Sequence, residues 1–566
     1  NVHSGIICEN GSEFTINYVI VNGNKTSGFQ SRDSHGQLTD VIIKNNLDGG
    51  LRCDNSTIGL ANVTITGNQT ANKGGGIYLT DSSIVHFDPE HLCNIYLNKA
   101  GIGRDLFSQN CPLTKVYLDT FTVAHASNYF ATPIDNFDFS IQYGKITQVH
   151  EDLYVSPNGD GSDEGISPEH PLKTIDMALT KIVADSLQPR TIYLSEGIYS
   201  RTNNNEFFPS SCRSYVTISG AGEEYTILDA EGKSRVMNCF YTNYANIQYV
   251  TLKNGYSTNG AGACIAYSDP KFSNVYIEHN AGIGLYCDHS NPKLYRTVIS
   301  DNQSSHPMDY GSGGGIYCYS SNPELINVTI TQNGSTYFYE GWFETSLYFS
   351  NSSPLIINSI IWDNAINELY CKSDTDTNSI TITYSNIQGG DSSIVVQGNM
   401  QINWLDGNIN SDPLFKEVET NDYSLLENSP CINAGTALFI WQGDTLLILP
   451  DSCYVGNAPD MGAIESVFLR LADFTQKLPT EFVLHRNYPN PFNSLTIISF
   501  QMPKEATVNL NIYNTLGQKV KTLINKRMNP GNYAITWDAS QFSSGVYIYK
   551  LTADNYSCCG KCLLLK

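Results

Sequence analysis

The chain has 566 residues, which is too long for one compact core unless a repeated unit lets the core extend along an axis. Its formal net charge is -22, so the summed field repels phosphate backbones and anionic lipid surfaces, and the sequence excludes nucleic acid as a partner. A polyanionic glycan is disfavoured for the same reason unless bound cations or a local basic groove offset the charge. No apolar run reaches the roughly 18 residues that a membrane-spanning helix needs. Because the chain enters repeat-like sequence directly at Asn1, we expect an export signal outside this sequence.

The first predicted element is a repeat of short apolar strands that each end in asparagine. YVIVNGN, DVIIKNN and NVTITGN end at Asn24, Asn46 and Asn68, at intervals of 22 residues. The residue three places before each asparagine is aliphatic and lies on the inward face of an alternating strand. Since a second strand signal follows each asparagine and no helix pattern intervenes, we expect the periods to stack as a parallel β-solenoid. We predict this solenoid, begun before Asn1, over residues 1–106 and a cap or linker over residues 107–150.

A new start follows at residue 151, with a strand, an acidic loop and an amphipathic helix. The helix has Ile175 and Leu179 on one face, and we expect it to cover the open first coil of a second solenoid. The acidic loop carries Asp160, Asp163 and Glu164. Oxygen-rich turns suit Ca²⁺, but the loop lacks the full DxDxDG spacing, so a calcium site and a plain acidic turn both remain open. Ca²⁺ is the only cofactor that the sequence suggests.

The second solenoid repeats the pattern with longer coils. Its strands end, at intervals of 22, 31 and 31 residues, at Asn280, Asn302, Asn333 and Asn364. Asparagines that recur at one turn position can hydrogen-bond along the stack and satisfy each other. We predict this solenoid over residues 151–410 and its closing cap over residues 411–470.

These asparagine ladders and aliphatic stacks resemble those of right-handed parallel β-helix proteins of the pectate-lyase type, over roughly residues 1–105 and 190–410. The resemblance implies the fold far more than a function. Arg296 is the best-placed basic residue, but no second arginine accompanies it at the spacing of pectate lyases, and the paired-Asp and GHG motifs of polygalacturonases are missing. The resemblance therefore brings no active site to this chain.

From about residue 478 the sequence changes to short alternating strands, TIISFQM, TVNLNIY, YAITWDA and GVYIYKL, which indicate a small Ig-like β-sandwich over residues 478–566. The motifs NYPNPFNSLTIISF, IYNTLGQKV and SSGVYIYKL closely resemble the C-terminal sorting domain of the type IX secretion system. That resemblance implies export by the type IX secretion machinery to a secreted or outer-surface location of a Gram-negative bacterium. A purely structural Ig-like module is the alternative. The predicted fold class is all-β, with tandem right-handed parallel β-helices followed by this sandwich.

Aromatic side chains are the candidate carbohydrate-binding residues. Two insertions of the longer coils fall on adjacent loops and carry Tyr310, Tyr337, Tyr339 and Trp342. Beside them, a column that alternates with inward aliphatic residues is expected to face outward and consists of Tyr286, Tyr317, Tyr348 and Tyr370. Flat rings suit the faces of sugars, but such rings also stabilise a solenoid by stacking on each other, so both interpretations stay open.

The candidate catalytic residues form a column directly before the asparagine ladder, which includes His279, Asp301 and Asp363. Asp301 and Asp363 are two coils apart, or about 10 Å, which is close to the separation in inverting glycosidases. Arg296 is the candidate base for a lyase. Because acidic residues are common at turns, a structural role for this column is the alternative.

We predict a non-catalytic, glycan-binding or adhesin-like surface protein that binds a polysaccharide or another extracellular ligand along the second β-helix. The alternative is a secreted polysaccharide lyase or glycoside hydrolase that acts along the same β-helix. A third hypothesis is a spacer that displays another domain.

Overall fold

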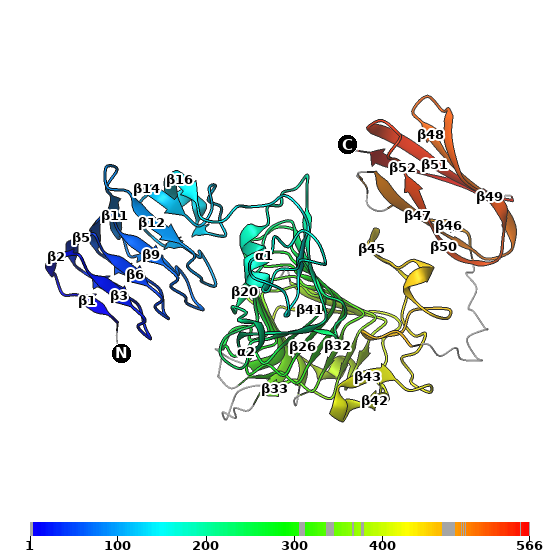
Figure 1. Cartoon of the computed structure of the whole chain (residues 1–566). Coiled ribbons are helices and arrows are strands. Elements are labelled where there is room, and N and C mark those ends of the chain that lie inside the picture. The colour runs from blue at the N-terminus through cyan, green and yellow to red at the C-terminus, as the bar shows by residue number, and fades with distance from the viewer. Residues whose placement is uncertain are drawn as a thin grey trace. The chain divides into compact units, whose positions relative to one another are not determined.

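The computed structural model describes residues 4–304, 312–335, 344–364, 367–374, 378–466, 481–487, 490, 492, 494–554 and 556–564. The chain forms two compact units, Asn1–Asp412 and Pro413–Lys566, and nearly all of its regular structure is β-strand (Figure 1). The first unit contains two parallel β-helices, each with a hydrophobic core of its own. No helix in the described part of the chain is long and apolar enough to cross a membrane.

The first β-helix consists of three parallel sheets, to which each complete coil adds one strand per sheet. The first sheet has the order β1 (Ile6–Cys8), β4 (Phe29–Arg32), β7 (Leu51–Asp54), β10 (Ile77–Thr80), β13 (Leu106–Ser108) and β15 (Ala131–Thr132). The second has the order β11 (Ile84–Phe87), β8 (Thr57–Ala61), β5 (His35–Thr39) and β2 (Glu13–Asn17). The third has the order β16 (Phe137–Gly144), β14 (Thr114–Phe121), β12 (Cys93–Tyr96), β9 (Thr64–Thr66), β6 (Ile42–Lys44) and β3 (Ile20–Asn22).

A ladder of buried asparagines runs along one corner of the first β-helix. The side-chain amide of each asparagine donates to the amide oxygen of the next one, over 2.8 Å from Asn24 to Asn46, 2.8 Å from Asn46 to Asn68 and 3.0 Å from Asn68 to Asn98. The last amide donates to the carboxyl of Asp105 at 3.0 Å, and burial raises the pKa of Asp105 to about 6. The predicted ladder is confirmed, and it ends on a carboxyl that the sequence period did not indicate.

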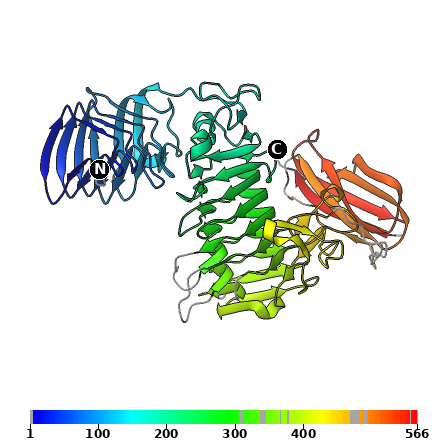
Figure 2. The same ribbon diagram turned by 60° about the horizontal axis from the view of Figure 1, so that its bottom comes forward.

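The second β-helix stacks more coils in the same way (Figure 2). Its longest sheet has the order β17 (Leu153–Val155), β18 (Arg190–Leu194), β21 (Val216–Ser219), β24 (Asn246–Lys253), β26 (Lys271–Glu278), β28 (Lys293–Ser300), β31 (Glu324–Ile326), β35 (Leu355–Ile357), β38 (Ser379–Thr383) and β41 (Gln401–Trp404). This sheet also includes β19 (Gly197–Ser200), β22 (Thr226–Asp229), β32 (Thr329–Thr331), β36 (Ile360–Trp362) and β39 (Asn386–Ile387). The next sheet has the order β20 (Ser210–Ser211), β23 (Met237–Phe240), β25 (Ala263–Ala266), β27 (Leu285–Asp288), β30 (Ser312–Tyr319), β34 (Glu344–Ser350), β37 (Asn367–Ser373) and β40 (Ile394–Gly398), and a short pair is β29 (Gln303–Ser304) with β33 (Gly334–Ser335).

The second β-helix has an asparagine ladder of its own. Its side-chain amides are joined over 2.8 Å from Asn280 to Asn302, 2.9 Å from Asn302 to Asn333 and 3.1 Å from Asn333 to Asn364. Asn364 donates to the carboxyl of Glu368 at 2.8 Å, and burial raises the pKa of Glu368 to about 7. Both ladders therefore end on a buried carboxyl.

A short helix, α1 (Ile175–Lys181), closes the start of the second β-helix, and its apolar face joins the core of that β-helix. Thr174 caps its N-terminus through a hydrogen bond from the amide of Met177. The carboxylate of Glu206 accepts the amides of residues 175 and 176, at 2.8 and 3.0 Å, while Arg213 donates to the carbonyls of Leu179 and Ile182, both at 2.6 Å. The first amides and the last carbonyls of a helix have no partners within the helix. Glu206 and Arg213 supply partners for them, so both ends of α1 are held in place. A second helix, α2 (Arg201–Asn204), follows β19, and a disulfide joins Cys212 to Cys239.

The second unit contains antiparallel sheets only, among its described residues. Two hairpins come first, β42 (Phe415–Glu417) with β43 (Asp422–Leu425) and β44 (Leu438–Trp441) with β45 (Asp444–Ile448). A sandwich follows, with one sheet of β46 (Val483–Leu484), β47 (Leu495–Met502) and β50 (Gly531–Asp538) and another of β49 (Lys519–Met528), β48 (Ala506–Asn514), β51 (Gly545–Ala553) and β52 (Tyr556–Leu564). Trp537 is fully buried in its core.

Candidate functional site

The predicted tyrosine column is present in the second β-helix, but two of its four side chains are buried. Tyr286, Tyr317, Tyr348 and Tyr370 stack with ring centroids 5.3, 4.8 and 5.0 Å apart. Tyr348 and Tyr370 are only 2% and 3% exposed, so the column does not form the continuous exposed strip that alternation led us to expect. Alternation tells which way a side chain leaves its strand, but it does not tell what covers that side chain. The other predicted aromatic residues, Tyr310, Tyr337, Tyr339 and Trp342, lie outside the described residues.

The predicted catalytic column occupies a corner where the backbone is left-handed. The φ angles of His279, Asp301 and Asp363 are 54°, 48° and 54°. In the first β-helix the corresponding residues before the ladder include Gly23 and Asn45, with φ of 68° and 53°. Glycine, asparagine, aspartate and histidine tolerate this conformation best, so the corner itself accounts for the acidic residues.

Two members of this column are nevertheless in contact. Nε2 of His279 lies 3.2 Å from Oδ2 of Asp301. The interaction with Glu278 and the nearby charge of Asp301 raise the pKa of His279. Arg296 lies at another left-handed corner, with φ of 47°, and its guanidinium stacks 5.5 Å from the ring of Tyr295.

The acidic loop near α1 does not gather its carboxylates. The carboxylate of Asp160 accepts the backbone amide of Ser162 at 3.0 Å. The ammonium of Lys181 donates to the backbone carbonyls of Asp163 and Glu164, at 3.3 and 3.1 Å, so a cation already contacts two oxygens of this loop. No group of three histidine, cysteine, aspartate or glutamate residues in the described ranges is arranged to hold a metal ion.

An exposed aromatic column lies at a different corner of the second β-helix and was missed by the sequence analysis. We call Tyr241, Tyr267, His289 and Tyr319 the corner column. The rings of its first three members stack in parallel, with centroids 5.2 and 5.1 Å apart, and Tyr319 meets His289 edge-on at 5.6 Å. Tyr241 and Tyr267 are 55% and 50% exposed. Three of these side chains are carried by left-handed backbone, with φ of 52°, 50° and 47° at residues 241, 267 and 289.

A ladder of buried hydroxyls fixes the position of this corner. The backbone amide that follows each corner residue donates to a serine of the next coil, over 2.9 Å from Thr242 to Ser268, 3.2 Å from Ser268 to Ser290 and 3.0 Å from Ser290 to Ser321. Tyr241, Tyr267 and His289 each stand directly before a ladder residue, whereas Tyr319 stands one place earlier, before Ser320. The turns SDP and SNP after Tyr267 and His289 carry this signal in the sequence, and aligning the residues before them would have found the column.

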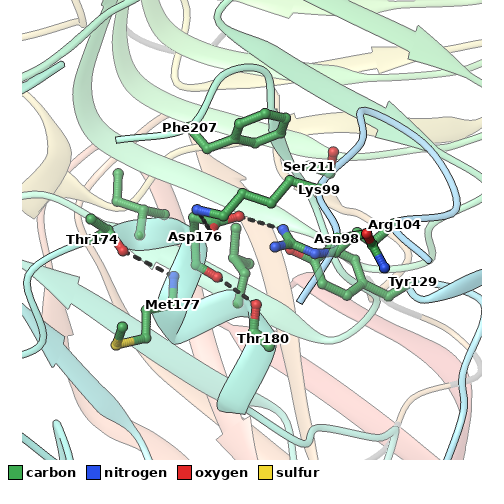
Figure 3. A network of polar contacts seen from close by, with 12 residues as sticks. Asn98, Lys99, Arg104, Tyr129, Thr174, Asp176, Met177, Thr180, Phe207 and Ser211 are labelled. Carbon is green, nitrogen blue, oxygen red and sulfur yellow. Dashed lines mark hydrogen bonds and ion pairs between the residues drawn. The ribbon is translucent and has the colours of Figure 1, made fainter. Parts of the chain in front are cut away.

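A buried ion pair joins the end of the first β-helix to the helix α1 (Figure 3). The carboxylate of Asp176 on α1 binds the guanidinium of Arg104, and it also binds the ammonium of Lys99 at 2.8 Å. Burial alone would raise the pKa of Asp176, but the two positive charges hold it well below its usual range. Arg104 also donates to the hydroxyl of Tyr129 at 3.0 Å, and Ser211 donates to the carbonyl of Gly101 at 2.8 Å. The two β-helices are thus held together by polar contacts between residues far apart in the sequence.

Two hollows lie next to this ion pair. The smaller has a volume of about 190 Å³ and is lined by Arg104, Tyr129 and Arg213 together with Tyr241 of the corner column. The larger, which we call the junction cleft, has a volume of about 510 Å³ and has walls from both β-helices. The hollows adjoin, because Ile102, Asn238 and Phe240 line both. The corner column, the smaller hollow and the junction cleft therefore follow one another on this part of the protein.

Comparison with protein families identifies two parts of the chain. Residues 486–564 match the family described as secretion system C-terminal sorting domain, and residues 4–110 match the right handed beta helix region. The protein is thus a right-handed parallel β-helix protein. More particularly, it is a β-helix protein that carries a sorting domain for type IX secretion, which makes it a secreted or cell-surface protein. The comparison with curated proteins found no match.

Proposed function

We propose that this protein is a non-catalytic surface protein that binds an extended polysaccharide along the second β-helix, with the corner column as the contact surface. The observation that carries the proposal is the exposure of Tyr241 and Tyr267, which are 55% and 50% accessible to solvent. Exposed aromatic side chains on a rigid scaffold are typical of binding surfaces.

The backbone at this corner makes the proposal stronger. A bulky residue in the left-handed region is an outlier and costs on the order of 1–3 kcal/mol. Farther along the same corner, Ser320 and Asn351 occupy the position with φ of 47° and 49°, so the fold does not require an aromatic residue there. A single exposed tyrosine on left-handed backbone also occurs at Tyr18, so it is the stacking of exposed rings in register at this corner that supports binding.

The geometry also indicates how a sugar would be recognised. The stacked rings cover each other's faces, so the column presents ring edges and polar groups at intervals of 5.2 and 5.1 Å. Tyrosine hydroxyls and the imidazole of His289 donate and accept hydrogen bonds. A polymer that lies along the stacked coils meets the same polar groups at each coil.

The proposal is tested with a panel of a β-glucan, a xylan, a mannan, polygalacturonate and alginate. Binding is measured by affinity electrophoresis, and reaction by the appearance of new reducing ends or unsaturated products. We expect binding of at least one neutral polymer without product, and at least tenfold weaker binding of that polymer for the double variant Tyr241→Asn/Tyr267→Asn. The matched control is Tyr18→Asn in the first β-helix, because Tyr18 is also exposed, at 82%, and left-handed, with φ of 58°. Equal binding by the double variant and the wild type would remove the column from the proposal.

A polysaccharide lyase or glycoside hydrolase is the second candidate function, and the contact between His279 and Asp301 favours it. A histidine with a raised pKa beside a carboxylate can act as a general acid. Product formation in the same panel that disappears in His279→Gln would replace the first proposal with this one. The residues Asp363, Arg296, Tyr310, Tyr337, Tyr339 and Trp342 stay predictions for either function.

A further inference from the structure

The junction cleft is distinguished by its charge. Four of its 18 lining residues are lysine or arginine, whereas 33 of the 566 residues of the chain are. These four are Arg52 and Lys73 of the first β-helix and Lys233 and Arg235 of the second. Asp48 is the single acidic residue among the lining residues, and its carboxylate accepts a hydrogen bond from Thr70 at 3.0 Å. A basic cleft has thus formed on a chain whose net charge is -22.

In the described part of the chain, two of the four cations, Arg235 and Lys73, have only neutral groups as hydrogen-bond or ring partners. The guanidinium of Arg235 donates to three neutral acceptors, Asn238 and Ser257 at 3.0 Å each and the carbonyl of Asn259 at 2.8 Å. The ammonium of Lys73 lies 4.8 Å from the ring of Phe107 and 3.5 Å from the amide oxygen of Gln109, which are neutral groups as well. Burial lowers the pKa of Lys73, as expected for an ammonium that has lost part of its water.

The other two cations are paired with carboxylates. Arg52 pairs with Asp54 at 2.9 Å and stacks 4.7 Å from the ring of Tyr78, and Lys233 lies 3.7 Å from Glu231. The carboxylates of these two pairs are only 10% and 17% exposed, and a carboxylate so placed is costly to leave unpaired. Lys73 and Arg235 are therefore the cations that an anion in the cleft would contact.

Aromatic and amide groups complete the lining. Tyr78 and Phe240 supply apolar surface, Tyr256 is 52% exposed, and Asn238 is buried with its amide 3.4 Å from the carbonyl of Gly101. A cleft of 300–1,000 Å³ with aromatic walls and a few polar groups is typical of a ligand site. Cations, rings and amides together match a ligand that has an anionic group, an apolar ring face and hydroxyls.

We propose that the junction cleft binds an acidic sugar unit of a polysaccharide, with Lys73 and Arg235 contacting its carboxylate or sulfate group. The ion pair between Asp176 and Arg104 holds the two walls of the cleft together. No residue of the corner column lines the cleft, so this inference does not depend on the proposed function. The junction cleft is the local basic groove that a polyanionic glycan needs in order to bind an acidic protein.

The test compares the full-length chain with polygalacturonate as the carboxylated probe, chondroitin sulfate as the sulfated one and dextran as the neutral one. Isothermal titration at two salt concentrations measures affinity. We expect at least one acidic polymer to bind at least tenfold more tightly than dextran, with affinity that falls as salt rises. The two acidic probes distinguish a carboxylate site from a sulfate site.

Charge variants locate the binding in the cleft. We expect Lys73→Gln/Arg235→Gln to weaken binding of the acidic polymer at least tenfold. The matched control is Lys271→Gln/Lys293→Gln, which removes the same charge from two residues that are paired on neighbouring strands of the second β-helix. Asp48→Asn should tighten binding about threefold, by removal of the one lining carboxylate, and a folding defect would not produce that gain.

Three results would overturn the inference. They are equal affinity for acidic and neutral polymers, no binding of any acidic polymer, and equal losses in the cleft and control double variants. Loss of neutral-glycan binding in the Tyr241 and Tyr267 variants alone concerns the corner column and leaves the cleft unaffected.

Discussion

The two β-helices of this protein build the same corner from different residues. In the first, the left-handed residues before the hydroxyl ladder are Gly11, Asp33, Asn55 and Ser82, with φ of 76°, 49°, 46° and 66°. In the second they begin with Tyr241, Tyr267 and His289. Small polar residues adopt this conformation readily, whereas aromatic ones do so at a cost. The fold therefore sets the backbone in both, and among these corner residues Tyr241 and Tyr267 depart from the types that suit it.

The asparagine ladders, unlike the corner residues, are built from the same residue type in both β-helices. Asparagine continues from coil to coil in both β-helices, and each series ends on a buried carboxyl, Asp105 or Glu368. Where a residue serves the fold, the two β-helices agree, and where they disagree a function in binding is the better explanation. The following experiments examine both parts of this comparison.

Removing one ladder asparagine should give the largest loss of stability among these experiments, and the loss should be equal in the two β-helices. Asn46→Ala and Asn302→Ala each remove the donor and the acceptor that serve the neighbouring coils. Each should lower the free energy of unfolding by about 3–5 kcal/mol, because buried amide groups lose their partners. Urea titration followed by circular dichroism measures this. The exposed Asn17→Ala is the control and should change stability by less than about 0.5 kcal/mol. A loss confined to one β-helix would contradict a shared support.

Neutralising the buried ion pair should separate the two β-helices. Asp176→Asn leaves the buried Arg104 and the partly exposed Lys99 without their carboxylate, and breaking such a buried pair costs about 3 kcal/mol or more. We expect a lower first transition in scanning calorimetry. The exposed pair of Arg527 with Glu505 provides the control, since Glu505→Gln should cost about 0–1 kcal/mol. An unchanged thermogram for Asp176→Asn would mean that other contacts hold the junction.

The ladder ends should make stability depend on pH. Asp105 has a folded pKa of about 6, above the value of the unfolded chain, so the folded protein holds its proton more tightly. This stabilisation is fully present below about pH 4 and is lost as the pH rises through 6, on the order of 3 kcal/mol in all. Asp105→Asn should therefore match the wild type at pH 4 and exceed it at pH 7.5, since the amide oxygen still accepts from Asn98. A constant difference between the two proteins in urea midpoints at both pH values would refute this assignment.

Exchanging the corner residues should give the smallest change. Asp33→Tyr should lower the free energy of unfolding by about 1 kcal/mol, and Tyr267→Asn should raise it by about the same amount. Thermal denaturation of the two variants measures both. If Tyr267→Asn is instead destabilising, the column supports the fold and strain no longer indicates binding.

The sequence predicts this fold well because equivalent residues recur at a regular interval, so successive coils can be aligned with one another. Asn24, Asn46 and Asn68 recur at a fixed interval, and the hydrogen bonds between them follow from that interval alone. The contact of Asp176 with Arg104 spans 72 residues and lies where the period breaks, so no repeat indicates it. The junction cleft could not be predicted from the repeat either, because its walls come from coils of two different solenoids. The positions of the corner column could have been predicted from the sequence, but the exposure of its side chains could not.

The side-chain hydrogen bonds of each asparagine ladder all run in one direction along the stack, and each ladder ends at a residue with a carboxyl group. Each asparagine passes a hydrogen bond to the coil that follows, so a final asparagine would present a donor to whatever coil came next, including one from another molecule. A carboxylate accepts and does not donate. When ionised, Asp105 and Glu368 thus end each series of amide donors on an acceptor, and strands such as β16 and β41 continue the stack beyond them.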